Sequence, residues 1–134
     1  MTSKPATLLM AVAALFIAIA TGLGAYASHG LDNVLDARAL ESLRTGVDYQ
    51  FFHSLGLFGI CLLLGRQRSN KLLLAAGASI AAGIVLFCGG VYASSLDGPG
   101  WISSLAPVGG IGLIGGWLVV AFAVLKPPAG SGSA

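Results

Sequence analysis

The chain has 134 residues, which is enough for a single domain. Hydrophobic residues make up 56% of it and charged residues 9%, against roughly 45–50% and about 25% in soluble proteins, so an ordinary water-soluble globule is excluded. The net charge of +2 comes from seven basic and five acidic residues without a basic stripe, so nucleic acid is excluded as a partner.

Four long uncharged stretches follow one another along the chain, at 5–28, 49–65, 72–96 and 101–125. A helix needs about 20 residues to cross a hydrocarbon core about 30 Å thick, and roughly 17 suffice. The runs are continuous rather than alternating, which favours helices over a membrane barrel. We therefore predict an all-α integral membrane bundle over residues 1–126, in which the lipid bilayer is the main partner. Its four spans are expected at about 6–27, 48–65, 72–96 and 104–125, and the Pro, Gly, Ser and Ala tail at 127–134 is expected to be disordered.

The first stretch has a second interpretation. Lys4, an apolar run and the small residues on either side of Tyr26 also resemble a secretory signal peptide with an A-x-A cleavage site. The run is longer than a typical signal core, and its removal would leave three spans with little to pack against. We therefore expect an intact first helix and keep cleavage as the alternative.

The segment between the first two spans has apolar residues four apart, interspersed with charges. This pattern predicts a short amphipathic helix lying along the outer membrane surface. Asp36 is expected to cap its N-terminus, Leu35 and Leu40 occupy the hydrophobic-staple positions, and Gly46 is expected to end it. The alternative is an ordinary connector that happens to be amphipathic.

Basic residues divide unequally between the two sides that these spans define. Five lie on the side of the chain ends, namely Lys4, Arg66, Arg68, Lys71 and Lys126. Only Arg38 and Arg44 lie on the other side, together with every acidic residue. The positive-inside rule then predicts a plasma (inner) membrane protein whose N- and C-termini are both cytoplasmic.

Small residues spaced four apart form stripes on three of the predicted spans: Ala14, Ala18 and Gly22; Ala75, Ser79 and Gly83; and Gly112 with Gly116. Such stripes let helix backbones approach closely in lipid, where hydrophobicity gives no drive to associate. Gly and Ala are also common in membrane helices for other reasons. Three stripes in one small protein favour a compact antiparallel bundle with packing surface to spare.

Four polar residues are predicted to meet near the outer end of the bundle and form the candidate site: His29, Gln50, His53 and Tyr92. Hydrogen-bonded structural histidines, a small-molecule or proton site, and haem or transition-metal ligation all fit such a cluster. Two histidines without further ligands in a recognised spacing are weak support for a metal, and neither cysteine lies in such a spacing. No cofactor and no metal are therefore predicted.

Catalytic motifs are not recognisable, and no span carries a charge near its centre, as ion-coupled carriers do. We therefore expect no enzyme activity and a role as an accessory or assembly subunit of a membrane complex, or as a homo-oligomer. Two alternatives remain open. One is a small-molecule or proton-conducting transporter, and the other is a haem- or metal-binding membrane subunit that uses His29 and His53.

Five short motifs carry a resemblance that spans nearly the whole chain: GAYASHGL at 24–31, YQFFHSL at 49–55, GGVY at 89–92, APVGG at 106–110 and GW at 116–117. In order and spacing they resemble the small multi-pass membrane family known as domain of unknown function 423, relatives of transmembrane protein 256. The first motif departs from the family pattern GAFGAHGL, because Tyr26, Ala27 and Ser28 replace Phe, Gly and Ala. The resemblance implies four membrane helices and an uncleaved first helix, and it implies no established activity.

Overall fold

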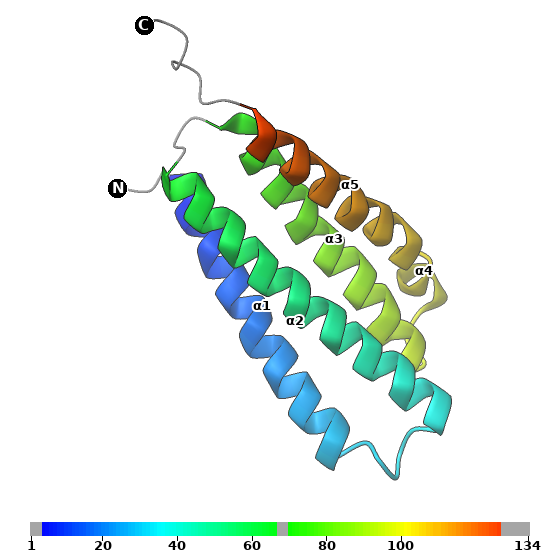
Figure 1. The fold of residues 1–134 in the computed structure, drawn as a ribbon. Helices are drawn as coiled ribbons and strands as arrows, with labels where there is room; N and C mark the ends of the chain where they lie inside the picture. The colour runs from blue at the N-terminus through cyan, green and yellow to red at the C-terminus, as the bar shows by residue number, and fades with distance from the viewer. Residues whose placement is uncertain (1–3, 67–69, 127–134) are drawn as a thin grey trace, which may run out of the picture.

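A computed structural model describes residues 4–66 and 70–126 of the chain. The tail at 127–134, for which the sequence predicts disorder, lies outside the described residues. Four long helices run side by side, and a short one lies near one end (Figure 1). The helices are α1 (Lys4–His29), α2 (Ala37–Arg66), α3 (Lys71–Ser95), α4 (Gly100–Ser103) and α5 (Ala106–Leu125).

The predicted fold class is confirmed. The helices α1, α2 and α3 and the segment Gly100–Leu125 are each long and apolar enough to cross a membrane. Capping side chains and proline determine where two of these helices begin. The Asn70 side chain accepts a hydrogen bond of 3.1 Å from the Leu73 amide at the start of α3, and a proline occupies the first turn of α5.

The amphipathic segment is helical, but it is not a separate surface helix. Asp36 caps it as predicted, with the Ala39 amide donating to Oδ1 at 2.8 Å. The helix then continues through Gly46 to Arg66, so the predicted end at Gly46 is wrong. Gly46 is buried, and a Cβ there would lie 2.7 Å from Cε1 of Tyr92. The glycine therefore serves close packing of α2 on α3, and no residue nearby breaks the helix.

Alanine forms the contact face of α1. The buried residues of this helix are spaced seven apart, and they are Ala6, Ala13, Ala20 and Ala27. This spacing keeps them on one side of a helix. They pack mainly toward α2 and to a lesser extent toward α3. Because Ala is small, the helix backbones approach closely along this line.

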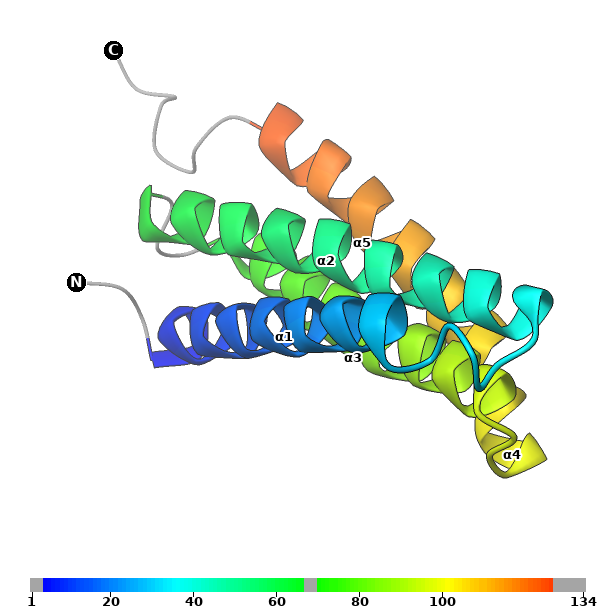
Figure 2. The same cartoon turned by 90° about the horizontal axis from the view of Figure 1, so that it is seen from below.

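Two of the predicted small-residue stripes meet between α3 and α5, except that Ala75 at the start of the α3 stripe is exposed. Gly83 faces Leu113 and the Gly109 carbonyl, and a Cβ on Gly109 would overlap the backbone of Phe87. The Ser79 hydroxyl also donates to the Gly112 carbonyl at 3.0 Å. These contacts make α3 the central helix, because α2 packs on it as well. In Figure 2, α5 diverges from α2 along its length.

The bundle has two ends, which we call the terminal end and the distal end. The terminal end holds the starts of α1 and α3, the end of α2 and Lys126. The distal end holds residues 30–36 and 96–105 (Figure 1). The basic residues Lys4, Arg66, Lys71 and Lys126 all lie at the terminal end.

Candidate functional site

Gln50 joins three helices inside the bundle. Its side chain is 4% exposed. The amide Nε2 donates to the Phe16 carbonyl of α1 at 2.8 Å, and the Tyr92 hydroxyl of α3 donates to Oε1 at 2.8 Å. Both the nitrogen and the oxygen of the Gln50 amide therefore make hydrogen bonds, and these bonds bridge α1, α2 and α3.

Ser54 completes this arrangement one turn further along α2. It is fully buried, and its hydroxyl donates to the Gln50 carbonyl at 2.5 Å. Within the described ranges no buried side-chain nitrogen or oxygen lacks a hydrogen-bond partner. The side chains in this network are neutral and all of them are hydrogen-bonded. The network therefore serves to hold the helices together. We call Gln50, Ser54, Tyr92 and the Phe16 carbonyl the Gln50 lock.

His29 lies far from the Gln50 lock. The lock is level with Phe16, which stands midway along α1, whereas His29 is the last residue of that helix. Thirteen residues of helix separate the two, a rise of about 20 Å. His29 is exposed, and in the described part of the chain its side chain makes no hydrogen bond. The structure therefore does not bring His29 to the other three predicted site residues.

His53 belongs to an aromatic cluster rather than to the lock. Its ring centroid lies 5.5 Å from that of Tyr49 and 6.3 Å from that of Trp117, and Tyr49 lies 5.1 Å from Phe87. His53 Nδ1 is 2.7 Å from the Tyr49 carbonyl. A carbonyl oxygen only accepts, so Nδ1 carries the hydrogen in this bond. The cluster links α2, α3 and α5.

Haem or metal ligation by the histidine pair does not fit this arrangement. His53 lies one turn from Gln50 on α2, near the level of Phe16, whereas His29 lies about 20 Å further along α1. Two ligands of one metal ion lie within about 2.0–2.3 Å of it. Among the described residues, no group of three or more His, Cys, Asp and Glu side chains could hold a metal ion.

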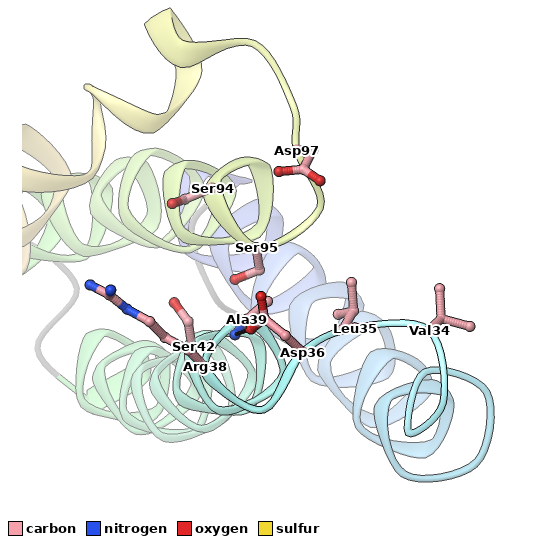
Figure 3. Close-up of a pocket in the computed structure, with 9 residues that line it drawn as sticks. All are labelled: Val34, Leu35, Asp36, Arg38, Ala39, Ser42, Ser94, Ser95 and Asp97. Atoms are coloured by element: carbon pink, nitrogen blue, oxygen red, sulfur yellow. Dashed lines mark hydrogen bonds between the residues drawn. The ribbon is translucent and has the colours of Figure 1, made fainter.

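A polar cavity of about 450 Å³ lies at the distal end (Figure 3). The first turns of α2 form one side of it, and the end of α3 with the following turn forms the other. Its polar lining residues are Asp36, Arg38, Ser42, Ser94, Ser95 and Asp97. The apolar Val34 and Leu35 also line it. Unlike the Gln50 lock, this cavity presents charged groups to a space large enough for a small molecule.

Sequence reasoning missed several of these residues. Ser54 is four positions after Gln50, so helical spacing places both on one face of α2 and could have identified it. The Phe16 acceptor is a main-chain carbonyl, for which the side-chain pattern carries no signal. Phe87 and Trp117 are apolar residues in apolar spans, and only the packing of α2, α3 and α5 brings them to His53.

Comparison with known proteins gives a consistent result. A family profile described as "Protein of unknown function (DUF423)" matches residues 23–110. The chain is 34% identical to the UPF0382 membrane protein YwdK of Bacillus subtilis, covering 81% of this chain and 88% of that protein. It is 36% identical to a UPF0382 membrane protein of Haemophilus influenzae, covering 78% and 82% respectively. The UPF0382 inner membrane protein YgdD of Escherichia coli is 29% identical, with 94% and 93% covered. No solved structure matches the chain significantly.

Proposed function

We propose that this chain, which belongs to the DUF423 family of small membrane proteins, is a non-catalytic accessory or assembly subunit of a membrane complex, or a homo-oligomer. The observation that carries this proposal is an unused packing surface on α1. Two of the small-residue stripes predicted from the sequence pack against each other between α3 and α5. The third stripe faces away from the bundle.

This third stripe comprises Ala14, Ala18 and Gly22, and all three residues are exposed. Ala11 and Ala25 extend it in both directions and are also exposed. The five residues are spaced three or four apart and lie opposite the buried Ala13 and Ala20 side of the helix. We call them the α1 small face. Lipid gains little contact area on such a face, whereas a helix backbone packs on it closely.

A second copy of the chain is the occupant that we propose for the α1 small face. Two copies inserted in one membrane with the same topology present α1 in parallel. The same stripe on both copies then forms an isologous, two-fold interface. Close parallel approach along small residues spaced four apart is a recurrent mode of helix association in membranes.

The test is the mass of the purified assembly. The full chain is extracted in a mild detergent, and its protein mass is measured by light scattering alongside an Ala18→Leu variant. We expect a dimer or larger complex for the unchanged chain and a smaller species for the variant, because leucine separates the two backbones. A monomer that moves solute across reconstituted liposomes would contradict the proposal and favour a transporter.

We also propose that the protein lies in the plasma membrane with both termini in the cytoplasm. The supporting observation is the charge at the two ends of the bundle. Lys4, Arg66, Lys71 and Lys126 lie at the terminal end, and Asp32, Asp36 and Asp97 lie at the distal end. Basic residues concentrate on the cytoplasmic side of membrane proteins. The relative YgdD is named an inner membrane protein, which agrees with this location.

A further inference from the structure

The distal cavity has the charges of a binding site for a small zwitterion. Asp97 and Asp36 supply carboxylates, Arg38 supplies a guanidinium, and Ser94 adds a hydroxyl. In the described ranges the only ion pair is Arg44 with Asp32 at 3.3 Å, so neither Arg38 nor Asp97 is neutralised by a protein partner. We propose that this cavity binds a phosphoethanolamine-type group, in which a primary ammonium and a phosphate are joined by a short linker.

Asp97 lines the cavity and has an unusual backbone conformation. Its φ of 54° places it in the left-handed region, where glycine is the usual residue. The hydrogen bond of 2.7 Å from the Gly98 amide to the Ala93 carbonyl closes the end of α3 around it. A glycine at 97 would adopt this conformation without strain. The aspartate adds a carboxylate at the cavity, and in our proposal this carboxylate receives the ammonium group.

Arg38 supplies the opposite charge. It lies in the first turn of α2, where the positive end of the helix dipole also favours an anion. In Figure 3, the Arg38 guanidinium and the Asp97 carboxylate reach to different sides of the lining residues. A group that carries both charges therefore matches this lining better than a simple cation or a simple anion. A guanidinium pairs well with phosphate oxygens.

The depth of the cavity allows two sources for such a group. Ser94 and Ser95 end the membrane-spanning helix α3, so the cavity lies where lipid headgroups meet water. The group can come from the headgroup of phosphatidylethanolamine or from free phosphoethanolamine. A primary ammonium donates up to three hydrogen bonds, whereas the trimethylammonium of phosphocholine donates none. We therefore expect the cavity to distinguish the two headgroups.

The test uses the full chain in maltoside micelles, titrated with phosphoethanolamine in a calorimeter. We expect saturable binding, and binding of phosphocholine that is at least tenfold weaker. The Asp97→Gly variant is expected to lose at least tenfold in affinity, while its melting temperature stays the same or rises because the backbone strain is relieved. Arg38→Gln is expected to show the same loss of affinity, and it tests the site even if Asp97→Gly fails to fold.

Glu41→Gln is the matched control. It removes one carboxylate charge from an exposed residue outside the cavity and should change neither quantity.

Native mass spectrometry distinguishes the lipid from the free compound. Phosphatidylethanolamine that stays bound to the unchanged chain, but not to Asp97→Gly, assigns the site to a lipid headgroup. Saturable binding of phosphoethanolamine without retained lipid assigns it to the free compound. The absence of both kinds of binding would overturn the proposal. Unchanged affinity in both Asp97→Gly and Arg38→Gln would overturn it as well.

Discussion

Gln50 is the buried polar side chain that links α1, α2 and α3 by hydrogen bonds. It is buried, and its amide bonds to α1 on one side and to α3 on the other. Hydrogen bonds between helices in membranes average about 0.6 kcal/mol and reach about 1.7 kcal/mol. A bond to a buried partner that cannot turn to water lies toward the upper part of that range.

A double-mutant cycle measures the contact between Gln50 and Tyr92. We expect Gln50→Leu and Tyr92→Phe each to destabilise the folded chain, and the pair to be less than additive by about 0.5–1.5 kcal/mol, since each single change already breaks the bond. The measurement is reversible unfolding in mixed micelles. Tyr26→Phe is the control, because Tyr26 is 57% exposed, and it should cost little. Strictly additive effects of Gln50→Leu and Tyr92→Phe would contradict the bond.

Of the four predicted site residues, the structure brings Gln50 and Tyr92 together but leaves His29 apart from them. Gln50 lies inside the bundle, and Tyr92 meets it across the helices. The sequence predicts a second span that begins near residue 48, which would set Gln50 and His53 level with the end of α1 and with His29. The helix instead begins at Ala37, so Gln50 lies well along α2, level with the middle of α1. The axial register of one helix against another depends on how they pack, and the hydrophobic pattern of each helix does not determine it.

At the scale of elements, α3 and α5 are held together by glycines that allow backbone contact. Gly109 packs directly on the backbone of Phe87, and Gly83 lies against Leu113. Gly115 lies on the same helix as Gly109, but a Cβ there would meet nothing within 4 Å. The two glycines therefore form a matched pair for a test of helix packing.

We expect Gly109→Ala to destabilise the protein by about 1–3 kcal/mol or more, because backbone atoms cannot move aside as a side chain can. Gly115→Ala should leave stability unchanged or slightly raised, since alanine is the better helix former. Thermal unfolding in detergent compares the two variants with the unchanged chain. Equal melting temperatures for both variants would show that α5 does not pack on α3 in this way.

Element boundaries were predictable where local chemistry determines them. Apolar runs predict four long helices, which the structure contains, and the side chain and position of Asp36 predict the cap that it forms. The continuation of α2 through Gly46 was not predictable from the local pattern, because a glycine after an amphipathic segment often ends a helix. Here Tyr92 of α3 packs over Gly46, so a contact distant in sequence decides its role.

At the scale of the whole molecule, the asymmetry of charge predicts the orientation in the membrane. Ser42 lies at the distal end, on the side that carries the acidic residues. In a cysteine-free background, an impermeant thiol reagent added to intact cells should label Ser42→Cys. Ser3→Cys, Ser69→Cys and Ser131→Cys should be labelled only after the membrane is permeabilised. Labelling of Ser69→Cys in intact cells would reverse the proposed topology.

The fold leaves the α1 small face as a surface that the single chain does not use, and we propose that two copies associate through it. Cross-linking in native membranes tests this association. Cys61 and Cys88 are changed to serine, and a single cysteine is introduced at Ala18 or, as the control, at Leu118, which is 66% exposed on α5. Mild oxidation should convert Ala18→Cys into a disulfide-linked dimer in several-fold higher yield than Leu118→Cys. Equal low yields at both positions would contradict self-association through α1.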